Sequence, residues 1–193
     1  MQKEDDIMKI TIARQCGSGG HLVAEVLSQK LGLEIFDKKR FVTEAKAQGI
    51  YNENAAFLDE KPVDSFIYSI AMSYGANNPR ERYMDFVKSL TQDKDCIIIG
   101  RCANFIYKDD PDCISVYLHA DTAARCSRLM ERDGISEKEA LKNIQTVDNK
   151  RRLFQEQCTD TRWGDGNEYD LCIDTGIGVE KAAQLILNYI NIK

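Results

Sequence analysis

The sequence has few of the features that mark a membrane-bound or nucleic-acid-binding protein. It contains no run of about 18 apolar residues, the length that crosses a bilayer, and its start, MQKEDDIMK, is acidic and lacks the apolar core of a signal peptide. We therefore expect a cytoplasmic protein with no membrane partner. The net charge of −5 argues against general nucleic-acid binding, so a local basic cluster has to meet any anionic ligand.

Cysteine spacing and the scarcity of proline indicate which class of fold the sequence can form. The seven cysteines are odd in number and never spaced CxxC, which argues against a structural zinc site or a disulfide framework. We expect reduced thiols, with Cys96, Cys102, Cys113 and Cys172 in the core beside predicted strands. Only three prolines and 12 glycines among 193 residues indicate regular structure throughout, and this length fits one domain.

Residues 9–41 combine a strand, a glycine-rich turn, a helix and a second strand. Residues 10–13 have the pattern of a buried strand, residues 19–31 carry apolar side chains at helical spacing, and residues 33–36 form a strand that ends at Asp37. Such a unit predicts parallel strands with a right-handed crossover. Glycines at a helix start are typical of a phosphate site, because N–H groups point outward there and the helix dipole favours negative charge. We predict a nucleotide on residues 17–20.

Three interpretations of the segment QCGSGGH are open from its residues. Residues 17–19 begin a dinucleotide fingerprint, and Asp37 lies 20 residues after the first glycine, but Leu22 replaces the last small residue of that pattern. As a P-loop, GxxxxGK[ST], the segment has the right length and context, but Gly20 and His21 stand where the lysine and the hydroxyl belong. The third interpretation is that the glycines only let helix and strand pack closely.

The rest of the chain predicts an α/β fold. Further strands are expected at residues 95–100, 113–119 and 169–174, and helices at residues 121–133, 136–157 and 178–190. Residues 38–93 show only helical patterns, at about 38–48, 53–59, 63–75 and 79–92. Five strands separated by helices make a doubly wound sheet, in which ligands bind outside the carboxyl ends of the strands. Those ends carry residues 14–20, Asp37, Arg101 and His119.

Three segments together resemble the cytidylate-kinase-like branch of the P-loop nucleoside monophosphate kinases. They are ITIARQCGSGGHLVAEVLSQKLG followed by EIFD, then IIIGRCANFI, and then VYLHADTAARCSRLMERDGISEKEALKNIQTVDNKRR. The resemblance implies a P-loop NTPase-type three-layer fold in one domain, residues 1–193, with a five-stranded parallel sheet between helices. It also implies a helical acceptor-binding insert at about residues 38–93 and a helical lid at about residues 121–165. At Gly20 and His21 the sequence lacks the lysine and the hydroxyl of the family, and this difference affects the expected catalysis but not the expected fold.

Basic residues on two predicted helices offer positive charge for phosphoryl transfer. Three arginines at i, i+3 and i+7 share a face of the first helix: Arg125, Arg128 and Arg132. Arg151 lies near the end of the second helix, after Asp148, and the planar arginine fork suits phosphate oxygens. The alternative is a solvated face with local ion pairs, such as Asp148 with Arg152. The resemblance implies that lid arginines close on both phosphates and that Asp148 and Arg151 meet the acceptor.

Other residues complete the site that the resemblance implies. Arg101 and Asn104 follow a buried strand where the family has a Gly-Arg-Asp segment for the acceptor, and Asn104 partly substitutes for the missing acid. Asp37 matches a family acid, and we expect it to organise Mg²⁺ through water, because this ion prefers carboxylate oxygen; a helix N-cap is the other interpretation. From their positions, we expect Arg14 to supply the positive charge of the missing lysine and His21 to donate a hydrogen bond to a phosphate.

The residues and the resemblance together predict an ATP- and Mg²⁺-dependent nucleoside monophosphate kinase for CMP or dCMP, with small-molecule nucleotides as its partners. The predicted catalytic residues are Arg14, Arg125, Arg128 and Arg151. The predicted ATP-binding residues are Gly17, Ser18, Gly19, Gly20 and His21. The predicted acceptor-binding residues are Asp37, Arg101, Asn104 and Asp148, and Asp37 is also the candidate for the metal. Two alternatives remain: a nucleotide-binding regulatory module without transfer activity, and a kinase for another small acceptor.

Overall fold

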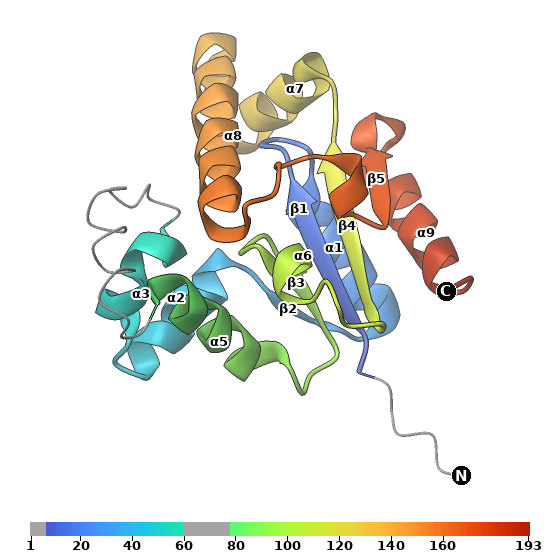
Figure 1. Ribbon diagram of the computed structural model, residues 1–193. Helices are drawn as coiled ribbons and strands as arrows, with labels where there is room; N and C mark the ends of the chain where they lie inside the picture. The colour runs from blue at the N-terminus through green and yellow to red at the C-terminus, as the bar shows by residue number, and fades with distance from the viewer. Residues whose placement is uncertain (1–6, 60–77) are drawn as a thin grey trace.

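The computed structural model describes residues 7–59 and 78–193 (Figure 1). Its five strands form one parallel sheet in the order β2-β3-β1-β4-β5. They are β1 (Lys9–Arg14), β2 (Glu34–Phe36), β3 (Cys96–Ile99), β4 (Cys113–His119) and β5 (Leu171–Asp174). The strands, their parallel pairing and the position of β1 at the centre confirm the predicted doubly wound sheet.

Helices connect the strands and match most of the predicted ones. Those before β3 are α1 (Gly20–Leu31), α2 (Lys38–Ala47), α3 (Tyr51–Leu58) and α5 (Pro79–Thr91). Those after it are α6 (Ala103–Ile106), α7 (Thr122–Asp133), α8 (Glu137–Thr159) and α9 (Val179–Ile190), with the 3-10 turns η1 (Gly166–Glu168) and η2 (Thr175–Ile177). The helix expected at residues 63–75 lies outside the described residues. The sequence analysis missed α6, η1 and η2, because three or four residues are too few to show a helical period.

Apolar side chains on both faces of the sheet make the three layers. α1 and α9 cover one face, where Ile10 and Ile12 of β1 pack with Leu27 and Ile186 (Figure 1). Helices α2, α3 and α5 cover the other face near β2 and β3, together with the last turns of α8. Phe154 of α8 joins this second core. The sheet is therefore buried on both faces, so polar sites can form only at the amino and carboxyl ends of its strands.

Local capping sets the helix starts around the carboxyl end of the sheet. Asp37 accepts a hydrogen bond from the Arg40 N–H (2.9 Å) and caps α2, as its second interpretation predicted. Asp121 caps α7, and a capping box of Ser136 with Glu139 opens α8. Only residues 134–136 separate α7 from α8, and both helices stand above the carboxyl ends of the strands (Figure 1).

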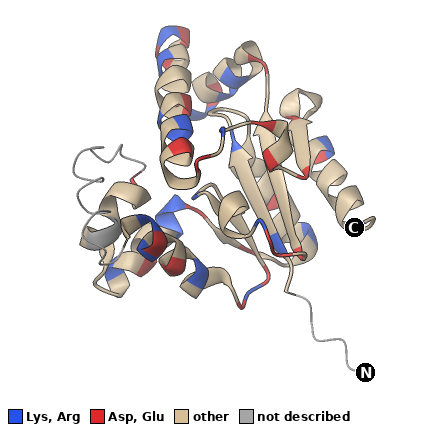
Figure 2. Ribbon diagram, viewed as in Figure 1, with Lys and Arg blue, Asp and Glu red and all other residues tan. Residues whose placement is uncertain are grey.

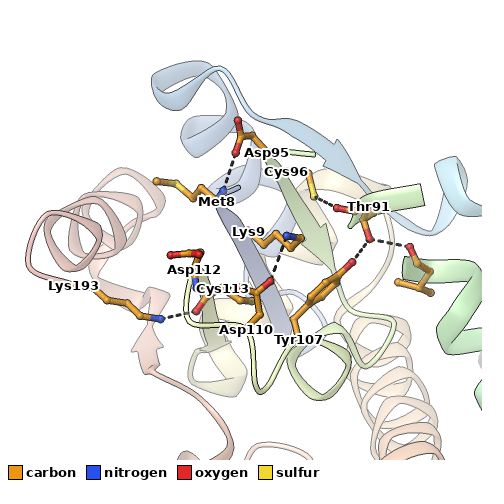
Figure 3. Close-up of polar contacts among 11 residues, drawn as sticks. Met8, Lys9, Thr91, Asp95, Cys96, Tyr107, Asp110, Asp112, Cys113 and Lys193 are labelled. Atoms are coloured by element: carbon orange, nitrogen blue, oxygen red, sulfur yellow. Dashed lines mark hydrogen bonds and ion pairs between the residues drawn. The ribbon is translucent and has the colours of Figure 1, made fainter. Parts of the chain in front are cut away.

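The amino end of the sheet holds a polar network (Figure 3). Lys9 of β1 is 4% exposed, its Nζ lies 3.3 Å from Oδ2 of Asp110, and it stands 5.2 Å from the centroid of the Tyr107 ring. The hydroxyl oxygens of Tyr107 and Thr91 are 2.7 Å apart. The buried lysine thus has an opposite charge and an aromatic face as neighbours, and these contacts indicate a structural role for Lys9.

The cysteines follow the burial pattern with one exception. Six of the seven are buried, as expected, but Cys172 is exposed because β5 is an edge strand with one side open to solvent. Burial raises the pKa of the Cys96 thiol to about 11 and that of Cys113 to about 12, so both stay protonated at neutral pH. Within the described part of the chain, none of the helices has the length and apolarity needed to span a bilayer.

Candidate functional site

The glycine-rich loop between β1 and α1 is tightly packed and strongly curved. Gly17 and Gly19 have φ values of +76° and +78°, in the left-handed region that glycine tolerates. A Cβ at Gly17 would lie 2.7 Å from the carbonyl oxygen of Arg125. Gly19 is the N-cap of α1, and no side chain among the described residues caps this helix. The N–H groups of its first turn have no partner inside the helix, so they can bind an anion.

Arg14, the last residue of β1, fills the space that a side chain at Gly20 would need. A Cβ at Gly20 would lie 2.8 Å from Cγ of Arg14, and a Cβ at Gly100 would overlap the Arg14 Nη1. The arginine therefore extends below the loop, from the start of α1 to the tip of β3, and is 7% exposed. Packing therefore explains the glycine at position 20, because the Arg14 side chain occupies the space that a side chain at this position would need.

Two side chains predicted to bind phosphate and acceptor, Arg125 and Asp148, are bonded to the loop. Asp148 of α8 accepts a hydrogen bond from the Cys16 N–H (2.6 Å) and pairs with Arg125 of α7. Arg125 also donates to the Cys16 carbonyl (3.3 Å). The local ion pair suggested between Asp148 and Arg152 is wrong, because Arg152 pairs with Glu156 instead, at 2.7 Å. Helices α7 and α8 are therefore bonded to the loop through this buried pair.

Arg128 makes a second connection to the loop, through a residue that the sequence analysis missed. It donates to the carbonyl of Thr175 (2.6 Å) and to its hydroxyl oxygen (3.0 Å), and the Thr175 hydroxyl donates to the Ser18 carbonyl (2.8 Å). Thr175 opens η2 directly after β5. Its position at the end of a strand is the feature of the sequence that could have pointed to this residue. Arg132, in contrast, is bonded to its neighbour Asp133 (2.7 Å) and largely exposed.

A cavity of about 760 Å³ lies beside the loop, and its size is that of a typical ligand pocket. Its polar wall includes Gly17, Gly20, His21, Arg14, Arg128, Arg132 and Arg151, together with two carboxylates, Glu25 and Glu131. The ribbon in Figure 2 marks basic residues along α7 and α8 above this end of the sheet, interspersed with acidic ones. The loop predicted to bind ATP thus faces a space with N–H groups and arginines on its walls.

A second, small cavity of about 20 Å³ lies at the tip of β3. Arg101 and Asn104, both predicted to bind the acceptor, line it together with Arg14 and Arg151. Asn104 is 7% exposed and does not cap α6, whose N-cap is Cys102. Arg14 and Arg151 therefore line both cavities and stand between the predicted donor and acceptor positions.

The tip of β3 is strained. Gly100, Arg101 and Cys102 have φ values of +74°, +63° and +56°, and each non-glycine residue in this region costs about 1–3 kcal/mol. Arg101 is 1% exposed and donates from Nη1 to the carbonyl of Leu58 (2.7 Å) at the end of α3. The strained turn therefore places Arg101 between the sheet and the insert.

Arg151 has the free bonding capacity that an anion would use. Its Nη1 donates to the carbonyl of Arg14 (3.0 Å), which fixes the side chain against the loop. Its Nε is buried and has no hydrogen-bond partner within residues 7–59 and 78–193. A buried N–H without a partner costs free energy, so it is a candidate for a bond to a ligand.

His21 and Asp37 face each other across the outer side of the loop. Nε2 of His21 lies 3.6 Å from Oδ2 of Asp37. Burial lowers the pKa of His21, and the nearby Arg14 lowers it further, while Asp37 opposes both. The neutral imidazole therefore predominates at pH 7. The other histidine, His119, stacks on the ring of Tyr117 at the end of β4, with the ring centroids 6.3 Å apart.

This fold and its loop define a P-loop kinase-type protein, and comparisons with known proteins agree. The chain belongs to the cytidylate kinase-like family, whose model matches residues 9–177. The chain is 26% identical to a cytidylate kinase of Archaeoglobus fulgidus, over 96% of both chains. It is 28% identical to a cytidylate kinase of Thermoplasma volcanium, over 95% of this chain and 92% of that one.

Solved structures support the same fold. An uncharacterized protein from Eubacterium ventriosum is similar at 28% identity and a TM-score of 0.74, covering 96% of this chain and 99% of that one. A shikimate kinase from Bacteroides thetaiotaomicron has a TM-score of 0.56 at 13% identity, covering 95% and 98% of the two chains, and this similarity concerns the fold alone. The predicted fold class and family resemblance are both confirmed.

Proposed function

We propose that this protein is an ATP-dependent nucleoside monophosphate kinase that phosphorylates CMP or dCMP. One observation carries the proposal: Arg14 and Arg151 line both the cavity beside the glycine-rich loop and the small cavity at the tip of β3. The small cavity has no room for a nucleotide, but it marks the tip of β3, beside which the acceptor would lie. A group transferred from a nucleotide on the loop to that acceptor would pass these two guanidinium groups. Phosphoryl transfer needs such positioning and charge neutralisation, with little covalent chemistry from the protein.

In this proposal the donor nucleotide binds to the loop. The triphosphate of ATP lies on residues 17–20 and His21, and accepts hydrogen bonds from the N–H groups at the start of α1. Arg125, Asp148 and Arg128 act as positioning residues, because their polar atoms are bonded to the loop and to Thr175. Our sequence analysis placed Asp148 against the acceptor and the two arginines against phosphate. The contacts instead favour a role in fixing the loop.

The acceptor is proposed to lie between Asp37, Arg101 and Asn104, against the insert at about residues 38–93. Asn104 lines the small cavity, and Arg101 connects it to α3. The choice of CMP or dCMP is supported by the family and by the two cytidylate kinases to which the chain is similar. Helices α7 and α8 form the proposed lid, at about residues 121–165.

In the proposed reaction an oxygen of the acceptor phosphate attacks the γ-phosphorus of ATP. The bond from that phosphorus to the β–γ bridging oxygen breaks, and ADP leaves with the electron pair. Arg14 and Arg151 neutralise the oxygens of the transferring group, in the place of the absent P-loop lysine. The carboxylate of Asp37 is a suitable donor for the Mg²⁺ of such kinases, and that ion would neutralise phosphate charge when bound.

The test is an assay of the purified protein with ATP, Mg²⁺ or Mn²⁺, and a panel of CMP, dCMP, UMP, AMP and GMP. We expect CDP or dCDP to form fastest, measured by chromatography of the products. No diphosphate from any acceptor, together with no nucleotide binding by calorimetry, would overturn the proposal.

A nucleotide-binding regulatory module is the second candidate, and the absence of the P-loop lysine and hydroxyl favours it. The Cβ of any residue at position 20 would lie against Arg14, so the loop has no direct room for the lysine. Tight binding of ATP without any diphosphate product in the same assay would select this candidate over the kinase.

A further inference from the structure

The loop carries an imidazole where a P-loop carries a hydroxyl. His21 lies in the first turn of α1, its side chain is 55% exposed, and it borders the cavity of about 760 Å³. A P-loop hydroxyl binds Mg²⁺ through oxygen. A neutral imidazole offers nitrogen instead, so the substitution changes which metal ions the site would favour.

A carboxylate is held in place to act with this imidazole. Oδ1 of Asp37 accepts the N–H of Arg40 (2.9 Å), and Oδ2 lies 3.6 Å from Nε2 of His21. Two donors bonded to one ion at about 2.1 Å lie about 3.0–3.5 Å apart, so a movement of a few tenths of an ångström brings both atoms onto a single ion. The cap on α2 restricts the rotation of the carboxylate and so maintains this geometry.

The protein alone supplies too few ligands for tight metal binding. Among the described residues no three histidine, cysteine, aspartate or glutamate side chains are grouped to hold a metal. The positive charges of Arg14 and Arg151, which border the same cavity, also disfavour a lone cation. Phosphate oxygens and water have to complete the coordination, so the ion would enter with the nucleotide.

We propose that His21 and Asp37 bind the divalent ion of a metal–nucleotide complex, and that the site prefers Mn²⁺ or Co²⁺ to Mg²⁺. The inference rests on the proposed function, since a nucleotide has to occupy the loop. Mg²⁺ prefers oxygen ligands and loses its waters reluctantly, whereas imidazole nitrogen suits first-row transition metals. Asp37 thus becomes a direct ligand, where our sequence analysis expected contact through water.

Pulsed electron paramagnetic resonance of Mn²⁺ bound with ADP tests the direct nitrogen contact. The full chain contains only two histidines, so labelling with ¹⁵N-histidine restricts the signal to His21 and His119. We expect ¹⁵N coupling to Mn²⁺ in the wild type and in His119→Gln, and no coupling in His21→Ser. His21 is exposed, and serine is common at helix starts, so this variant is expected to fold.

Calorimetry of ADP binding provides the second measurement. Loss of a residue that only supports a metal ligand weakens metal binding by about 10–100-fold, so we expect His21→Ser to weaken Mn²⁺–ADP binding at least about tenfold. Binding of Mg²⁺–ADP should be retained or improved, because serine restores the oxygen donor. The ratio of Mn²⁺ to Mg²⁺ affinity is therefore expected to fall in this variant and to stay unchanged in His119→Gln.

The outcomes separate the inference from the proposed function. Bound Mn²⁺–ADP without ¹⁵N coupling, or an unchanged affinity ratio in His21→Ser, overturns the metal assignment and leaves the kinase proposal standing. Absence of nucleotide binding with either metal overturns both.

Discussion

The central strand β1 begins and ends with a buried cation, and the surroundings of the two differ. Lys9 at the amino end is 4% exposed and Arg14 at the carboxyl end is 7% exposed. Lys9 meets the carboxylate of Asp110 and the face of an aromatic ring (Figure 3). Arg14 and two further arginines line a small cavity to which the described residues contribute no carboxylate.

The two ends of β1 differ in their charge balance, which indicates a structural role for Lys9 and a ligand-binding role for Arg14. The carboxylate of Asp110 compensates the charge of Lys9 within the fold, so the amino end needs no ligand. Arginines grouped on a cavity wall attract phosphate, because the guanidinium group bonds well to phosphate oxygens. We therefore expect the carboxyl end to gain stability when phosphate groups bind.

Arg14→Met gives the largest expected effect and tests the carboxyl end. Methionine keeps most of the stem that packs below the loop, but it removes the charge. An arginine that neutralises a transferring phosphoryl group is worth about 10³–10⁵ in kcat, so we expect kcat to fall at least about 10³-fold. Steady-state assays with ATP and the best acceptor provide the measurement. Lys9→Met is the matched control, and its folded fraction should keep the wild-type kcat; equal losses in both variants would contradict the distinction.

Ligand-induced stabilisation tests the charge balance at equilibrium, without the need for turnover. A ligand at 100 times its Kd stabilises the native state by about 2.7 kcal/mol. For a chain of this size, this raises Tm by about 5–11 °C, at about 2–4 °C for each kcal/mol. We expect tripolyphosphate or ATP to produce this shift in wild type and in Lys9→Met, as measured by differential scanning fluorimetry. The shift should be much smaller in Arg14→Met and should decrease with added salt. A full shift in Arg14→Met would place the anion elsewhere.

Filling position 20 tests whether Arg14 occupies the lysine's space. Because a Cβ at Gly20 would lie 2.8 Å from the Arg14 Cγ, Gly20→Ala is expected to cost about 1–3 kcal/mol of unfolding free energy. Gly20→Lys should lose stability as well and gain no activity, although it restores the P-loop consensus.

A double-mutant cycle isolates this contact. In the Arg14→Ala background the Gly20→Ala substitution should cost less, because the Cγ at 2.8 Å is gone and only the Cβ of residue 14, at 3.1 Å, still crowds the new side chain. Urea unfolding measures all four proteins. An equal cost of Gly20→Ala in both backgrounds would show that the loop itself, and not Arg14, excludes a side chain.

Most of the fold could be predicted from the sequence, because its signals are local. The apolar run of β3, the helical spacing in α1 and the caps at Asp37, Asp121 and Ser136 each depend on a few neighbouring residues. The helix α6 escaped prediction because it has only four residues. Cys172 was misplaced because the sequence does not show which strand lies at the sheet edge.

The site was harder to predict, because its contacts join distant segments. Asp148 bonds to Cys16 across 132 residues, and Arg128 bonds to Thr175 across 47. Helical spacing placed the arginines of α7 on one face, but spacing cannot show which of them face the loop. The missing lysine was visible in the sequence, whereas the reason for Gly20 required the position of Arg14.

Lys9→Met gives the smallest effect and tests the amino end. The lysine is buried, but the Asp110 side chain is 25% exposed and can be solvated once its partner is gone. We therefore expect a loss of about 1–2 kcal/mol, toward the lower end of the range for hydrogen bonds to charged groups and below the cost of breaking a fully buried pair. Urea unfolding measures this loss, and Asp110→Asn should lose at least as much, because it leaves the buried Lys9 ammonium without an opposite charge, although the amide oxygen still accepts a hydrogen bond from it. If Lys9→Met were instead as stable as wild type but unable to bind nucleotide, the amino end would belong to the functional site and the contrast along β1 would fail.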